Sequence, residues 1–119
     1  MSVVEALQEL GFRPEVHEVA KSLVGYEGRA RPEVAHIIIP RSQLRSASND
    51  LGFKVLPNGK IEAIVSEYDQ RAGFGAEWLG KVTQLAGVHT LLKKAQARGL
   101  RAVRQVDAKG RLQVVVYAR

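Results

Sequence analysis

The feature that most constrains the fold of this chain is a change in the spacing of its apolar residues. Residues 76–98 carry a stripe of side chains three or four positions apart, as on one face of a helix: Trp78, Val82, Leu85, His89, Leu92 and Gln96. Residues 2–10 repeat that spacing over a shorter stretch. Gly11 and Gly99 follow the two segments and are typical helix stops. The spacing therefore predicts a short first helix and one long helix.

Elsewhere the apolar residues alternate in short segments bounded by turn residues, which predicts strands. The expected strands include Pro14–Val19, Glu33–Ile39, a hairpin whose second strand covers 61–69, and a final hairpin closed by Asp107–Gly110. The order is α-β-β-β-β-α-β-β. We expect a single domain, 1–119, of the α+β class: a two-layer sandwich in which an antiparallel sheet carries two helices on one face.

Two further local signals concern the helix starts. Ser2 followed by Glu5 forms a capping box, in which the hydroxyl and the carboxylate satisfy free backbone N–H groups. Gly73 and Gly75 precede the long helix, where a glycine turn can hold a phosphate. The full glycine motif of phosphate sites is missing and Glu77 follows, so we interpret this turn as a connection.

The composition excludes several classes of function. Cysteine is absent, which removes disulfides, thiolate nucleophiles and cysteine-ligated zinc, and fits a cytoplasmic protein. Hydrophobic residues make up 45% and charged residues 25%, as in soluble globular domains. We expect no membrane contact, because no apolar run reaches the length of a span and the N-terminus is not typical of a signal peptide.

The positive charge is concentrated at one end. The net charge is +6, yet residues 93–119 alone hold eight basic residues and one acidic residue, a net of +7. Alternation in the last hairpin places Arg101, Arg111 and Tyr117 on one sheet face and Arg104 on the other. The candidate residues for binding a partner protein or a nucleic acid are Lys93, Lys94, Arg98, Arg101, Arg104, Arg111 and Tyr117.

Signals for catalysis or for a metal are weak. His17 shares a strand face with Glu15, but no histidine pair has the spacing of a zinc site. His36 and His89 are interpreted as structural. Glu67 and Asp69 share a face of the expected strand 61–69, where charge discourages aggregation of the sheet edge. We expect no metal, no cofactor and no catalytic residue.

Three spaced pieces of the chain resemble a known family. They are Gly25–Ile39 with Gly-Tyr-Glu-Gly before a strand, Asp50–Asp69 with Leu-Gly-Phe-Lys before a hairpin, and Arg98–Arg119. The family is domain of unknown function 1257, small proteins of cyanobacteria, plastids (as a hypothetical chloroplast reading frame), bacteria and phages. The resemblance implies a soluble, single-domain, intracellular protein and assigns no reaction or functional residue. The basic C-terminal end and the loop Pro40–Asp50 depart from the family pattern.

These observations lead to three functional hypotheses. The first is a small, non-enzymatic binding or adaptor domain that engages a larger protein partner through its C-terminal helix end and hairpin. The alternative is a nucleic-acid-binding protein that uses the same basic residues on phosphates. The third is an enzyme with a site near His36, Glu67 and Asp69. A homo-oligomer would be indicated if Val103, Val115 and Tyr117 were exposed together.

Overall fold

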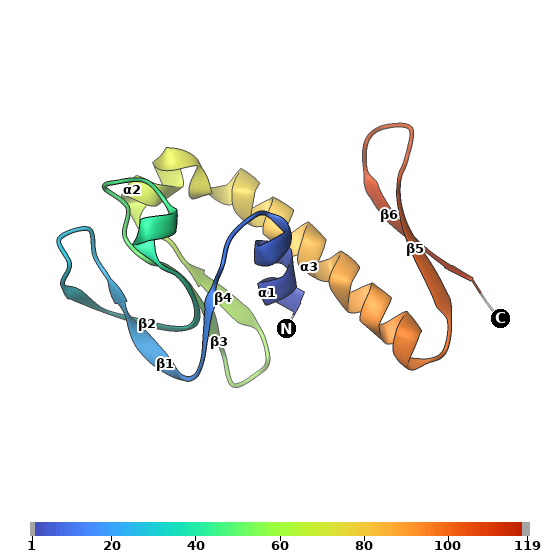
Figure 1. Cartoon of the computed structure of the whole chain (residues 1–119), viewed down its shortest axis with the longest axis horizontal. Coiled ribbons are helices and arrows are strands. Elements are labelled where there is room, and N and C mark those ends of the chain that lie inside the picture. Colours follow the sequence, from blue (N-terminus) through green and yellow to red (C-terminus); the bar gives the residue numbers. More distant parts are fainter. Residues whose placement is uncertain (1, 118–119) are drawn as a thin grey trace.

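The computed structural model describes residues 2–117 and has an elongated shape (Figure 1). Its extents are 54 × 32 × 22 Å. Its radius of gyration is 16.1 Å, whereas a compact domain of this length has one of about 13–14 Å. The C-terminal hairpin accounts for the elongation, because it lies beyond the main sheet at the far end of the longest helix.

The main sheet is an antiparallel meander of four strands. They are β1 (Glu15–Val24), β2 (Ala30–Ile39), β3 (Leu51–Val55) and β4 (Ile61–Ile64), paired in that order. The turns after β1 and β3 contain Gly28 and Gly59 with φ of 84° and 82°, which side chains rarely adopt. Short connections of this kind make consecutive strands neighbours.

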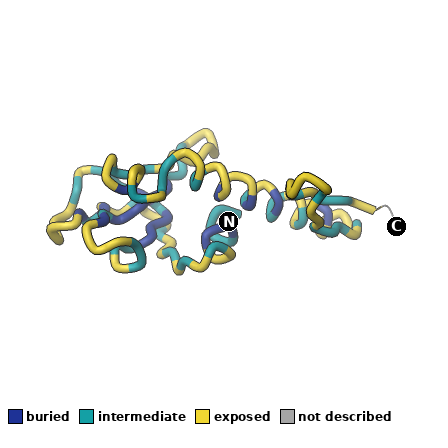
Figure 2. The backbone as a smooth tube through the Cα atoms, turned by 90° about the horizontal axis from the view of Figure 1, so that it is seen from above, coloured by how far each residue is buried: buried dark blue, intermediate teal, exposed yellow. Residues whose placement is uncertain are grey.

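Two helices cover one face of this sheet. Ala6 and Leu7 of α1 (Ser2–Glu9) and Val82 and Leu85 of α3 (Ala76–Ala97) are buried with the inward side chains of β2 and β3: Ile37, Ile39, Leu51 and Phe53. Figure 2 shows these buried segments in dark blue inside the sheet and along one side of α3. Of the stripe predicted for residues 76–98, Trp78, Val82 and Leu85 face the core, whereas Gln96 is exposed. The two-layer α+β arrangement is confirmed.

On the opposite face, the sheet curls so that residues of β1 and β2 cover the start of β3. Leu23, Ala35 and Ile38 form a second buried cluster over Gly52, the second residue of β3. A Cβ at Gly52 would lie 2.6 Å from the Ala35 Cβ, so only glycine fits this approach. The curl brings the end of β1 to the start of β3, where the Val24 N–H donates to Asp50 Oδ2 at 2.8 Å.

The segment between β4 and α3 differs from the prediction of a strand over 61–69. The strand ends at Ile64, and Ser66 caps a short helical turn, α2 (Glu67–Asp69), by accepting the Asp69 N–H. A π turn, η2 (Gln70–Phe74), then leads into α3. Local capping by Ser66 outweighs the continuation of the apolar alternation. Glu67 and Asp69 therefore do not share a strand face.

The prediction of a capping box at the first helix is wrong. The Ser2 hydroxyl accepts a hydrogen bond of 2.7 Å from the Thr90 hydroxyl of α3, and the Glu5 carboxylate faces His89 and Lys93. Both side chains of the expected box are thus used to hold α1 against α3. A tertiary contact has replaced the local one.

The last two strands form a sheet of their own. β5 (Arg101–Val106) and β6 (Leu112–Tyr117) pair with each other, and neither joins the main sheet. The element order expected from the sequence is confirmed, with α2 added to it, while the strands divide into two sheets. The cause is α3, whose length of about 33 Å carries the hairpin past the edge of the main sheet. No helix within residues 2–117 is long and apolar enough to cross a membrane.

Candidate interaction surface at the C-terminal end

The candidate residues of the hairpin lie on two different faces. Arg101 is opposite Tyr117, and alternation places Arg104 and Leu112 on the other side. That side points toward the helices, because Arg104 contacts Glu9 of α1 and Leu112 packs against the main core. The side that points away, which we call the outer face, consists of Arg101, Val103, Gln105, Gln113, Val115 and Tyr117.

An ion network joins the hairpin to both helices. The Arg104 guanidinium donates to both oxygens of Glu9, at 2.7 and 3.0 Å. His89 lies between the two carboxylates of α1, with Nε2 3.0 Å from Glu9 and Nδ1 3.4 Å from Glu5. Lys93 forms an ion pair with Glu5. These five residues form one patch of alternating charge across α1, α3 and β5.

The network changes the acid–base behaviour of its members. The hydrogen bond from Arg104 lowers the pKa of Glu9, and His89 lowers it further, against the opposing effect of desolvation. The same bond raises the pKa of Arg104. His89 is the satisfied boundary histidine that the sequence predicts. Since Lys93 and Arg104 are paired with carboxylates of this chain, they contribute little charge to an external partner.

The outer face combines one cation with apolar and aromatic surface. The Arg101 guanidinium carbon lies 5.4 Å from the centre of the Tyr117 ring, a cation–π contact that fixes both side chains. Val103 is opposite Val115 in the middle of the face, and both are half-buried. Tyr117 is 46% exposed. This face offers an aromatic ring, an arginine and two valines within one short ribbon.

Arg111 lies one residue before the start of β6 and is held by Asp107, the residue opposite it. It precedes β6 in the turn, where its N–H donates to Asp107 Oδ1 and its Nε donates to Asp107 Oδ2, each at 2.8 Å. The backbone N–H of Arg111 is the main cause of the lowered pKa of Asp107. Arg111 is a turn residue whose charge is partly offset.

Four basic residues of the C-terminal segment form no ion pair inside residues 2–117: Lys94, Arg98, Arg101 and Lys109. All four are exposed. Lys94 and Arg98 belong to the last turn and the C-cap of α3, and Lys109 is at the hairpin tip. The candidate surface is thus an apolar ribbon bordered by cations at both ends.

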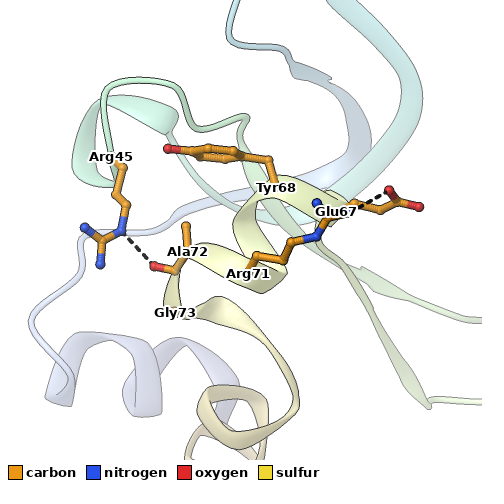
Figure 3. Close-up of a pocket in the computed structure, with 6 residues that line it drawn as sticks. All are labelled: Arg45, Glu67, Tyr68, Arg71, Ala72 and Gly73. Atoms are coloured by element: carbon orange, nitrogen blue, oxygen red, sulfur yellow. Dashed lines mark hydrogen bonds and ion pairs between the residues drawn. The ribbon is translucent and has the colours of Figure 1, made fainter.

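A hollow lies at the other end of the molecule, beside α2 and η2 (Figure 3). It has a volume of about 920 Å³ and is lined by Arg45, Glu67, Tyr68, Arg71, Ala72 and Gly73. Arg45 donates to the Ala72 carbonyl at 2.7 Å, and Arg71 reaches the Glu67 carboxylate at 3.4 Å. The Glu67 and Arg71 side chains are more than three-quarters exposed. A basin with solvated walls lacks the enclosure with which ligand sites bury their ligands.

The residues considered for catalysis have separate structural roles. His36 Nδ1 accepts the Val55 N–H at 3.0 Å, as a structural histidine would. Asp69 is 1% exposed, and its Oδ2 accepts from the Ser66 hydroxyl and the Asn49 N–H. His17 bonds Glu15 at 3.1 Å, and within residues 2–117 no three His, Asp or Glu side chains are grouped as metal ligands. Each of these side chains thus makes a hydrogen bond within the fold.

Asp50 and Asp69 explain why the spaced motifs of the sequence occur together. Asp50 accepts backbone N–H groups from Val24 and Arg41, while Asn49 accepts the Tyr26 N–H and donates to Asp69. The turn after β1, the loop before β3 and α2 are therefore joined in one place. These contacts close the curled sheet and give the motifs a structural role.

Sequence reasoning missed Glu5 and Glu9 as partners of the basic segment. Glu9 and Arg104 are 95 positions apart, so no local pattern connects them. The available signal was their spacing, since carboxylates four positions apart lie on one side of a helix. The capping-box pattern of Ser2 and Glu5 conceals this spacing in the sequence.

Comparison with known proteins identifies a family for most of this chain. The family model described as "Protein of unknown function (DUF1257)" matches residues 6–115, which is most of the chain. Neither the search of curated proteins nor the search of solved structures found a match.

Proposed function

The chain belongs to the family described as protein of unknown function DUF1257, and we propose that it is a cytoplasmic, non-enzymatic adaptor domain that docks onto an acidic surface of a larger protein. The docking surface is the outer face together with Lys94 and Arg98. The observation that carries the proposal is the exposed pair of Arg101 and Tyr117 beside two valines on a protruding hairpin. Arginine and tyrosine are the residues that most often anchor protein interfaces.

The charge that remains favours a protein over a nucleic acid. Binding to phosphates depends on the number of cations free to replace counterions. Lys93, Arg104 and Arg111 are paired with Glu5, Glu9 and Asp107, which leaves four unpaired basic residues in the described segment. The centre of the outer face is apolar. A carboxylate-rich partner with apolar side chains complements both features.

The proposal is tested with a fluorescein-labelled acidic probe peptide, made of an alternating Val and Tyr centre flanked by glutamates. We expect anisotropy to report binding in low salt, and Arg98→Glu/Arg101→Glu to weaken it about tenfold or more by reversing two charges at the surface. Tyr117→Ala should weaken it as well, through loss of the aromatic anchor. Lys60→Glu, in the exposed β3–β4 turn, is the matched charge-reversal control and should bind as the parent does.

Duplex DNA and RNA serve as competing ligands in the same assay, across about 50 to 200 mM salt. Nucleic acid that binds more tightly than the peptide, with a steep linear salt dependence and loss in the Arg98→Glu/Arg101→Glu variant, would replace the adaptor proposal. Absence of peptide binding even in low salt would also overturn it. A second copy of this chain as the partner would appear as a dimer in sedimentation.

A further inference from the structure

We propose that the partner segment binds as an added strand along the outer edge of β6, with acidic residues at its two ends. This inference rests on the proposed function and specifies how the same surface is engaged. Its basis is the hairpin, which is a sheet of only two strands in the described part of the chain. Each strand pairs with the other alone, so its remaining edge carries unpaired backbone groups.

The register identifies those groups. Asp107 donates its N–H to the Arg111 carbonyl at the turn, and residue pairs of an antiparallel ladder alternate from there between bonded and non-bonded. The backbone groups of Gln113 and Val115 therefore face β5. Those of Leu112, Val114 and Val116 face away from it, along the open edge.

The edge of β6 lacks the features that protect other edges. Its sequence, Leu112–Tyr117, contains no charged residue and no proline, and its pairing with β5 is continuous. By contrast β1, an edge of the main sheet, carries Glu15, Glu18 and Lys21 and has two irregularities of register. An apolar, regular edge without charge or bulge readily pairs with another strand.

The other edges in the molecule are less suited to a partner. β4 is only four residues long and carries Glu62. β5 has Arg101 and Arg104, and Arg104 is held by Glu9 of α1. Among the edges that the structure describes, β6 combines length with an uncharged side.

The positive charge around β6 favours an acidic segment of another protein over a second copy of this chain as the added strand. Arg98 and Arg101 lie at the open end of the hairpin and Lys109 and Arg111 at its tip, so cations border β6 at both ends. A second copy of this chain pairing through β6 would bring the cations at the ends of the two hairpins, Arg98, Arg101 and Lys109, close to one another. A segment from another protein, extended over about 20 Å with an apolar centre and acidic ends, complements this edge.

The test uses the full chain and the acidic probe peptide, with amide hydrogen exchange followed by NMR. We expect the peptide to slow exchange at Leu112, Val114 and Val116, because its backbone groups would pair with theirs. Gln113 and Val115 are bonded to β5 in the free protein and should change little. Amide protection that does not alternate along β6 would overturn strand addition. So would peptide-induced changes confined to the side-chain signals of the outer face.

Two modified peptides separate the failure of this inference from the failure of the proposed function. Each is N-methylated at every second residue, one on the odd and one on the even positions. Strand addition predicts that one of them loses binding about tenfold or more while the other binds as the parent, because one set of N–H groups faces β6. Equal binding of the two, with the unmodified peptide bound, would contradict strand addition and leave docking onto the outer face. An unmodified peptide that does not bind would overturn both.

A variant of the protein provides a further test. Val116→Pro removes an N–H that the register places on the open edge, so the β5–β6 ladder should persist while the peptide binds about tenfold more weakly. Val116→Thr is the control, because it keeps the N–H and the branched shape. Unchanged binding by Val116→Pro would contradict the inference. The β5–β6 ladder is checked in each variant through the exchange of Gln113 and Val115.

Discussion

Glu9 of α1 contacts both Arg104 of the hairpin and His89 of α3, so this one carboxylate links three elements. Its pKa is lowered in the folded protein, chiefly by Arg104. The folded state therefore gains stability above the ordinary value near 4.5 and loses it as the pH falls through the lowered pKa. We expect Glu9→Gln to reduce the free energy of unfolding by about 1 kcal/mol at pH 7, a modest effect because both side chains are one-third exposed.

The measurement is urea unfolding at neutral pH and again well below the ordinary carboxylate pKa, where the pH has passed the lowered pKa of Glu9. The difference between Glu9→Gln and the parent should shrink in acid, since protonation removes the same charge that the substitution removes. Glu62→Gln, an exposed glutamate of β4 outside the ion pairs of residues 2–117, is the matched control. If the two variants lose equal stability at both values, Arg104 does not stabilise the fold through Glu9.

At the scale of the elements, two glycines are present for different reasons. Gly52 is closely packed, whereas Gly80 has free space and only lowers the helix propensity of α3. Gly52→Ala in β3 would bring a Cβ to 2.6 Å from the Ala35 Cβ and 2.9 Å from Leu23, so we expect a loss of about 1–3 kcal/mol. Gly80→Ala in α3 meets no heavy atom within 4 Å and should gain about 0.5–1 kcal/mol. Thermal or urea unfolding of the two variants checks both signs. A Gly52→Ala variant as stable as the parent would mean that the curl of β1 and β2 over Gly52 does not exclude a methyl group. A loss in Gly80→Ala would contradict the gain expected from helix propensity.

The elements also mark how far the sequence predicts this fold. The long helix and both hairpins were predictable, because Gly99, the Pro57–Lys60 turn and the alternation of Leu112–Tyr117 are local signals. The end of β4 was missed because Ser66 acts as a cap that alternation conceals. The division into two sheets was not predictable, since it depends on the length of α3 relative to the main sheet.

The contacts of the candidate surface also divide into those with a local sequence signal and those without one. The pairing of Arg101 with Tyr117 follows from turn position and alternation, which are local. The pairing of Lys93 and Arg104 with α1 is not local, because Glu5 and Glu9 lie near the other end of the chain. The pairing of Arg111 with Asp107 is local as well, since the two residues are four positions apart across the hairpin turn.

At the scale of the whole molecule, stability is unevenly distributed. The hairpin is attached through Leu112 and the Arg104–Glu9 contact, whereas β2 and β3 are buried between two clusters. We expect amides of β5 and β6 such as Val103 and Val115 to exchange about a hundredfold faster, or more, than those of Ile37 and Phe53. Hydrogen exchange under native conditions measures the difference.

Loosening the attachment should act on the hairpin alone. Arg104→Ala is expected to speed exchange in β5 and β6 and leave β2 and β3 close to their original rates, because it cuts only the link to α1. Arg98→Ala, at an exposed cation outside the ion pairs of residues 2–117, is the control. Uniform exchange across both sheets would show that the molecule opens as a single cooperative unit.

The contact between α1 and α3 has a consequence for biosynthesis. Ser2 and Thr90 are 88 positions apart, so at about 5–20 residues per second the ribosome needs roughly 4–18 seconds between them. During that interval the apolar side of α1, with Ala6 and Leu7, has no helix to pack against. The nascent chain thus exposes an apolar N-terminal segment until α3 has been synthesised. We expect a chaperone to bind the nascent chain at this stage of translation.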